Sequence, residues 1–222
     1  MTPLWVLPAF ALVGVAMAAL VNWGADALPP GSRGARPALW AGQRGSLSLE
    51  RRSLVTLACL LGAPLLALAF GVGWRALWLL GWSAVFLLIA VVDFEHRLVL
   101  NRVLLFGAGV ALVASLLSFP PAPALVPAQL GGGVGLALFA VVAAVGRGAM
   151  GAGDVKLAGM LGLVLGYPLV LTGLVVGIVF GGVAAAVALL RGRGRKSTIP
   201  YGPWLVAGAL FALLQAAAQT AA

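Results

Sequence analysis

Long apolar stretches recur along nearly the whole chain, and short polar segments separate them. Each stretch is continuous rather than alternating, which is typical of helices that cross a lipid bilayer. The stretch at 155–166 is short for a hydrocarbon core of about 30 Å, so we expect a half-membrane or tilted helix there. We predict an all-α, polytopic membrane helix bundle with about eight spans, at residues 3–22, 54–70, 75–92, 103–118, 128–146, 155–166, 168–190 and 203–220.

The cationic residues orient these spans. When the N-terminus lies outside the cytoplasm, every Lys and Arg except Arg75 falls in a cytoplasmic segment, as the positive-inside rule requires. The proline-rich, uncharged segment 119–127 then lies outside. Removal of one span would scatter the cations over both sides of the membrane. We therefore expect both termini outside.

The composition excludes a soluble domain. Of the 222 residues, 63% are hydrophobic and only 9% are charged, and the mean hydropathy is +1.12. A soluble domain has about 25% charged residues, so this chain could not cover a surface that faces water. The 31 glycines follow no three-residue period, which excludes a collagen-like chain. Because cytoplasmic loops explain the net charge of +9, the expected partner is the lipid bilayer and not a nucleic acid.

The longest polar segment covers residues 23–53 and contains a run of prolines and several arginines. It is too small and too polar to form a core of its own. We therefore predict a cytoplasmic loop within a single membrane domain, 1–222. Glycines at every fourth position, at 162 and 166 and at 173, 177 and 181, predict close packing between helices.

The acidic residues fall into two groups. Asp26 and Glu50 belong to the polar segment 23–53, where we expect them to be solvated. Asp93 closes an apolar run, and Asp154 lies in Gly151-Ala152-Gly153-Asp154-Val155-Lys156, where another apolar run begins. Both fall at the cytoplasmic membrane boundary in the predicted topology. An ionisable residue at membrane depth is costly, which makes these two aspartates functional candidates.

Two aspartates on one face of a helix bundle can act as a catalytic pair. When their carboxyls approach to about 3 Å they share one proton, because both cannot ionise. The ionised aspartate can take a proton from a water that attacks a peptide carbonyl, while the protonated one donates to the carbonyl oxygen. We predict Asp93 and Asp154 as this pair. Gly151 and Gly153 would allow backbone conformations closed to other residues and a close approach of the substrate.

The residues alone leave other roles open. Asp93 and Asp154 could cap helices, or pair with the nearby Arg97 and Lys156. A polytopic transporter could use the same aspartates to bind a proton or a cation, although the inverted repeats typical of transporters are not visible in the sequence.

No metal site is expected. His96 is the only histidine and Cys59 the only cysteine, which excludes a histidine-rich or cysteine-rich cluster. Glu95 could join Asp93 and Asp154 as a third carboxylate ligand, but three acids scattered in the sequence are weak evidence for a metal site. Cys59 lies in an apolar run, where we expect a small buried residue.

Three motifs resemble those of the type IV prepilin peptidases, a family of membrane aspartic peptidases. Asp93 followed by Leu98-Val99-Leu100-Asn101 resembles the family's first-aspartate motif, with Leu100 in place of its proline. Residues 151–157 resemble the GxGDxK signature, and Ile199-Pro200-Tyr201-Gly202-Pro203 resembles the IPFGP element at the start of the last span. The motifs follow the family's order within residues 80–220, which we predict to be the peptidase core.

This resemblance implies a bacterial inner-membrane aspartic endopeptidase with Asp93 and Asp154 as its catalytic residues. It would remove the basic leader of type IV prepilins or pseudopilins, after a glycine at the cytoplasmic membrane face. An inactive relative that serves as a scaffold in pilus assembly is the alternative, and the motifs specify no oligomeric state. The remaining motif positions are expected to shape the site or bind the substrate: Gly151, Gly153, Lys156, Asn101, Pro200 and Gly202.

The first third of the chain matches the family less well. Leu28-Pro29-Pro30-Gly31-Ser32 is similar to the RLPxGxS stretch that precedes the family's cytoplasmic loop. In many relatives that loop carries Cys-x-x-Cys pairs, which are associated with zinc and with N-methylation of the product. This chain has none of those cysteines. We expect peptidase activity without a cofactor, and a use for S-adenosylmethionine only if methyltransferase activity is retained.

Overall fold

The computed structural model describes residues 6–29, 45–146, 150–191 and 200–219. These residues form eight helices and no strand, which confirms the prediction of an all-α fold. The order of the helices follows the predicted apolar runs. The helices are α1 (Val6–Ala27), α2 (Gly45–Phe70), α3 (Trp74–His96), α4 (Asn101–Leu116), α5 (Leu125–Val145), α6 (Ala152–Leu165), α7 (Leu169–Leu190) and α8 (Gly202–Gln219).

Six of these helices are long and apolar enough to cross a membrane, namely α1, α2 from Glu50 onward, α3, α5, α7 and α8. The other two, α4 and α6, have 16 and 14 residues. A helix of 14 residues rises about 21 Å, which is less than the hydrocarbon thickness of about 30 Å. The expectation of a short helix at 155–166 is therefore confirmed, and the predicted span at 103–118 also forms a helix shorter than a full span.

The polar segment 23–53 is not a loop throughout, contrary to the prediction. α1 continues to Ala27 and α2 begins at Gly45. Residues 30–44, with the Pro30-Gly31-Ser32 part of the motif, lie outside the described residues. Helices extend beyond apolar runs because their backbone hydrogen bonds do not depend on apolar side chains. α5 also begins earlier than predicted, at Leu125 inside the predicted loop 119–127, because Leu125 and Val126 are apolar and proline is tolerated in the first turn of a helix.

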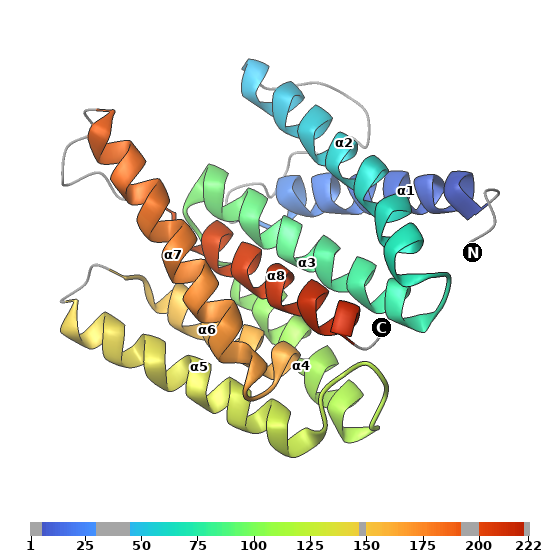
Figure 1. The fold of residues 1–222 in the computed structure, drawn as a ribbon. Helices are drawn as coiled ribbons and strands as arrows, with labels where there is room; N and C mark the ends of the chain where they lie inside the picture. The colour runs from blue at the N-terminus through green and yellow to red at the C-terminus, as the bar shows by residue number, and fades with distance from the viewer. Residues whose placement is uncertain (1–5, 30–44, 147–149, 192–199, 220–222) are drawn as a thin grey trace. The chain divides into compact units, whose positions relative to one another are not determined.

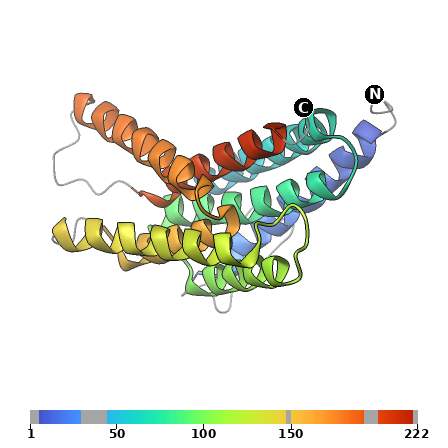
Figure 2. The same ribbon diagram turned by 60° about the horizontal axis from the view of Figure 1, so that its bottom comes forward.

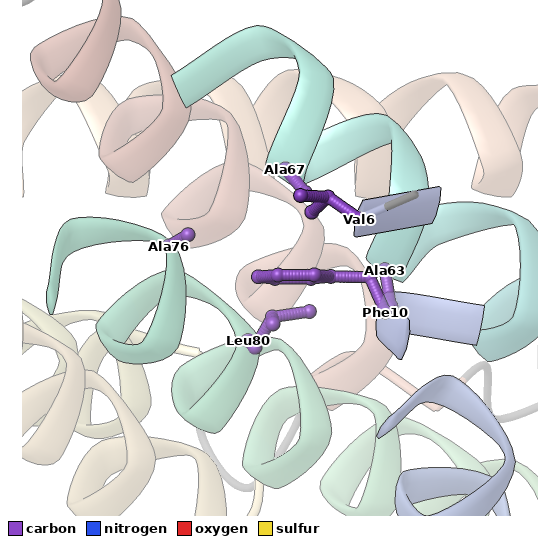
Figure 3. Close-up of a cluster of buried hydrophobic side chains, with 6 residues drawn as sticks. All are labelled: Val6, Phe10, Ala63, Ala67, Ala76 and Leu80. Atoms are coloured by element: carbon purple, nitrogen blue, oxygen red, sulfur yellow. The ribbon is translucent and has the colours of Figure 1, made fainter. Parts of the chain in front are cut away.

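The chain divides into two compact units, Met1–Leu88 with Ala217–Ala222, and Ile89–Ala216. The second unit lies within the segment 80–220 that is predicted to be the peptidase core. In the first unit, α1 packs against α2 (Figure 1). Apolar side chains from α1, α2 and the first half of α3 form a buried cluster (Figure 3), which consists of Val6, Phe10, Ala63, Ala67, Ala76 and Leu80. Cys59 is buried in α2, as expected.

Asp26 is partly exposed and pairs with two arginines, whereas the prediction was a solvated side chain without such partners. Its Oδ1 accepts a hydrogen bond of 2.7 Å from Arg51, and its Oδ2 accepts one of 2.6 Å from Arg52. The Asp26 side chain is 26% exposed, so these ion pairs are partly shielded from solvent. They join the last turn of α1 to the N-terminal part of α2. Glu50, by contrast, is exposed as predicted.

In the second unit, α5 and α6 form the most extensive helix pair and lie side by side in Figures 1 and 2. Their backbones are in contact where Gly131 faces Gly162. The approach is so close that a Cβ on either glycine would clash with the backbone of the other. α7 and α8 touch in the same way where Gly173 and Gly177 face Gly208. The predicted close packing between helices is confirmed at Gly162, Gly173 and Gly177, whereas Gly166 ends α6 with φ 73° and faces Pro123.

Candidate functional site

Asp93 lies near the C-terminal end of α3 and is almost fully buried, with 4% of its surface exposed. Its Oδ2 accepts a hydrogen bond of 3.0 Å from the backbone N–H of Gly202, the first residue of α8. The first N–H groups of a helix have no partner within it and carry partial positive charge, so they stabilise a carboxylate. A Cβ on Gly202 would lie 2.7 Å from the same oxygen, so only glycine fits here without displacement.

Asp154 lies in the first turn of α6, ahead of the apolar run 155–166 and outside the six spanning helices. Its carboxylate accepts a hydrogen bond from the backbone N–H of Gly151, the N-cap of α6, as in one half of a capping box. Burial raises the pKa of Asp154, and the negative charge of Asp93 raises it further, to about 6, while the Gly151 N–H acts in the opposite direction.

The structure brings the two aspartates together from the end of α3 and the start of α6. Their electrostatic interaction opposes the simultaneous ionisation of both carboxyls. A pair of this kind can hold one proton and one negative charge, which is the combination that acid–base chemistry requires. The alternative role in helix capping also has a basis, because Asp154 caps α6. The other alternative was an ion pair between an aspartate and Lys156. In the structure, Nζ of Lys156 donates a hydrogen bond of 3.2 Å to Oδ1 of Asn101.

The glycines before Asp154 do not use unusual backbone conformations, contrary to the prediction. Gly151 has φ −75° and ψ 148°, which any residue can adopt, and Gly153 lies within α6 at a negative φ. What Gly153 provides is space, because a Cβ there would lie 3.0 Å from Cβ of Val99. A Cβ on Gly151 would make an ordinary contact, 3.7 Å from Oδ2 of Asp154.

The turn between α3 and α4 lies against the start of α6. Arg97 adopts the left-handed conformation with φ 51°, and its N–H donates a hydrogen bond of 2.9 Å to the carbonyl of Asp93. Val99 then contacts Gly153. Leu100 has φ −74°, within the narrow range to which proline is restricted, so the turn keeps its course without the family's proline.

Tyr201 is a site residue that the sequence analysis did not single out. Its ring contacts Gly181 on α7 and lies 6.4 Å from the ring of Phe139 on α5. Burial and the negative charge of Asp154 raise the pKa of Tyr201, so its hydroxyl remains protonated near neutral pH. The only sequence signal was a tyrosine where the family's element has phenylalanine. Pro200, which precedes it, is partly buried.

The residues that follow Asp93 are exposed at the end of α3. Nε2 of His96 lies 3.9 Å from Oε2 of Glu95. Among the residues that the structure describes, no group of three His, Cys, Asp or Glu side chains is placed to hold a metal ion.

Phe94, the residue after Asp93, is 57% exposed and packs edge-on against Trp204 of α8, with ring centroids 6.5 Å apart.

Comparison with known proteins finds similarity to one family. Residues 80–186 match the model of the type IV leader peptidase family. A prepilin leader peptidase/N-methyltransferase of Bacillus subtilis (strain 168) is 30% identical over 174 residues, which cover 78% of this chain and 68% of the relative. Its namesake from Stutzerimonas stutzeri is 32% identical over 189 residues, or 79% of this chain and 64% of the relative.

A third prepilin leader peptidase/N-methyltransferase, from Xanthomonas campestris pv. campestris, is 31% identical over 144 residues, which cover 61% of this chain and 49% of the relative. The matched part of the chain thus spans between about half and two thirds of the length of these curated relatives. No solved structure is significantly similar to the chain.

Proposed function

Because the chain belongs to the type IV leader peptidase family, we propose that it cleaves the leader peptide from type IV prepilins or pseudopilins by aspartic catalysis. Its six apolar helices and its family make it a multi-pass membrane peptidase. The membrane is the bacterial inner membrane, with the scissile bond at the cytoplasmic face. The distribution of cations supports this orientation, because the segments that flank Asp93 and Asp154 are then the cationic, cytoplasmic ones.

The observation that carries the proposal is the placement of the two aspartates: Asp93 is buried at the end of α3, where its Oδ2 accepts a 3.0 Å hydrogen bond from Gly202, and Asp154 lies in the first turn of α6, where burial and the charge of Asp93 raise its pKa. Asp93 is the general base, because the Gly202 N–H favours its ionised form. We assign the shared proton to Asp154, whose pKa is raised to about 6 by burial and by the charge of Asp93. Asp93 is buried and Asp154 is partly buried, which limits their contact with bulk solvent and strengthens their effect on a bound peptide.

The reaction follows from these roles. Asp93 takes a proton from water as the water oxygen attacks the carbonyl carbon, and Asp154 gives its proton to the carbonyl oxygen. The tetrahedral intermediate then collapses: the proton on Asp93 passes to the amide nitrogen, the C–N bond breaks, and the hydroxyl proton of the intermediate returns to Asp154. Both carboxyls end in their starting states, so no cofactor is required.

The substrate approaches through the membrane. Phe94, next to Asp93, presents an exposed aromatic face that Trp204 supports from α8. An apolar segment of the substrate can pack on this face while the bond beside it reaches the aspartates. Glu95, also beside Asp93, lies in the exposed end of α3 and has no role in the proposed chemistry.

The test is cleavage of a prepilin peptide, with its leader and apolar helix, by the purified protein in detergent. Wild type should release the leader, and Asp93→Asn and Asp154→Asn should each lower kcat by at least about 100-fold. Glu95→Gln is the matched control and should retain activity. Full activity in either Asn variant would remove that aspartate from the mechanism. Ion flux after reconstitution into sealed lipid vesicles, with no cleavage in detergent, would instead favour a transporter.

We propose further that the chain cleaves without methylating the product, or methylates it without a zinc-bound loop. A four-thiolate zinc site needs four cysteines, and Cys59 is the only one and lies within α2. Mass spectrometry of the cleaved N-terminus, after reaction with S-adenosylmethionine present, should find no methyl group, or one that persists after metal chelation. A methyl group that disappears on chelation would contradict the proposal.

A further inference from the structure

The turn between α3 and α4 contacts the helix ends that carry both aspartates. We infer that Val99 is a positioning residue, which sets the separation of Asp93 and Asp154 by seating its side chain on Gly153. This inference rests on the proposed function, because it concerns the geometry of the catalytic pair.

The turn is fixed to the Asp93 side by the backbone. The N–H of Arg97 donates to the Asp93 carbonyl at 2.9 Å, and the left-handed φ of 51° at Arg97 reverses the chain directly after α3. Val99 follows two residues later. Its position relative to Asp93 is therefore set by a short, capped segment and not by a flexible loop.

On the other side, Val99 meets α6 one residue before Asp154. The Cβ of Val99 lies 3.0 Å, and its Cγ2 3.3 Å, from the place that a Cβ on Gly153 would occupy. The β-branched side chain of valine has restricted freedom about χ1, so it acts as a rigid spacer. A second tie, the 3.2 Å hydrogen bond from Lys156 to Asn101, is exposed and therefore weaker.

Added bulk at this contact should move the start of α6 away from the turn. A Cβ at 3.0 Å from another Cβ requires a shift of a few tenths of an ångström, because ordinary contact begins at 3.4 Å. That shift acts on Asp154, the next residue along. Catalysis is sensitive to such displacement, since a misplacement of about 1 Å can lower the rate about 100-fold. Substrate binding along the apolar helices should be unaffected.

The experiment compares wild type with Gly153→Ala, Val99→Gly and the double variant, using the prepilin cleavage assay. Gly153→Ala should lower kcat about 10-fold or more, with KM within about twofold of wild type. In the double variant, the space left by Val99 accommodates the new methyl group. The kcat of the double variant should be about 10-fold higher than the value expected if the fold-changes of the two single variants simply multiplied. Gly133→Ala, on α5 where nothing lies within 4 Å of the added Cβ, is the matched control and should leave kcat unchanged.

Melting temperatures of the same variants provide a readout that needs no substrate. Gly153→Ala should lower the melting temperature, and Val99→Gly should lower it less in the Gly153→Ala background than in wild type. Wild-type kcat in Gly153→Ala, a raised KM with unchanged kcat, or strictly additive effects would overturn the inference. If wild type cleaves no prepilin, the proposed function fails, and the melting temperatures alone decide whether Val99 is seated on Gly153.

Discussion

Replacement of Gly202 by alanine tests how closely α8 holds the first aspartate. The added Cβ would lie 2.7 Å from Oδ2 of Asp93 and 3.2 Å from its Cγ. The carboxylate would have to move by about 0.7 Å to restore an ordinary contact of 3.4 Å. That movement lengthens or breaks the 3.0 Å hydrogen bond from the Gly202 N–H. Loss of a hydrogen bond to a charged group costs about 1.5–3 kcal/mol.

We expect Gly202→Ala to lower kcat about 30- to 100-fold, because both the position and the ionised form of Asp93 depend on this contact. Single-turnover cleavage of a prepilin peptide measures the chemical step directly. Gly182→Ala on α7, where a Cβ meets nothing within 4 Å, is the control. A folded Gly202→Ala protein with kcat within twofold of wild type would refute this account of Asp93.

Three further predictions concern stability and topology. Asp154→Asn should raise the melting temperature above pH 6 and leave it unchanged below about pH 4. The pKa of Asp154 is raised to about 6 in the folded state, so the ionised carboxylate destabilises the folded protein only at pH values above the pKa of the unfolded state, about 3.9. A larger gain at pH 4 than at pH 8 would contradict this prediction. Asp26→Asn should lower the melting temperature by several degrees while kcat changes little, because Arg51 and Arg52 lose their shared carboxylate; an unchanged melting temperature would mean that the ion pairs do not hold α1 to α2. Reporter fusions at 97 should read cytoplasmic and fusions at 122 external, and a cytoplasmic signal at 122 would contradict the eight-span topology.

The helices were predictable because the signal for a bilayer-crossing helix lies in consecutive residues. About 20 apolar residues in a row suffice to locate such a helix, whatever it packs against. The ends were less predictable. Hydropathy marks where the apolar residues stop, whereas α1 continues to Ala27 and α2 begins at Gly45 through polar residues that still complete backbone hydrogen bonds.

The two aspartates could be selected as candidates because ionisable residues at the ends of apolar runs are rare. Their supporting contacts were not, since these join residues far apart in sequence. Gly202 is 109 residues from Asp93, and no local pattern indicates that its N–H meets that carboxylate. The pairing of Asp26 with two arginines and the contact of Val99 with Gly153 depend on tertiary packing in the same way.

The length of α6 has a consequence for water supply. At 14 residues, α6 falls about 9 Å short of the hydrocarbon core, so both of its ends cannot reach the membrane surface in a bilayer of ordinary thickness. Bilayers adapt to such a helix by thinning, and non-helical backbone at membrane depth is tolerated where water reaches it. Asp154 occupies the first turn of this helix. A bilayer that thins over α6 would bring water toward the first turn of this helix, and so toward the Asp93–Asp154 pair, where the proposed hydrolysis consumes one water molecule per bond.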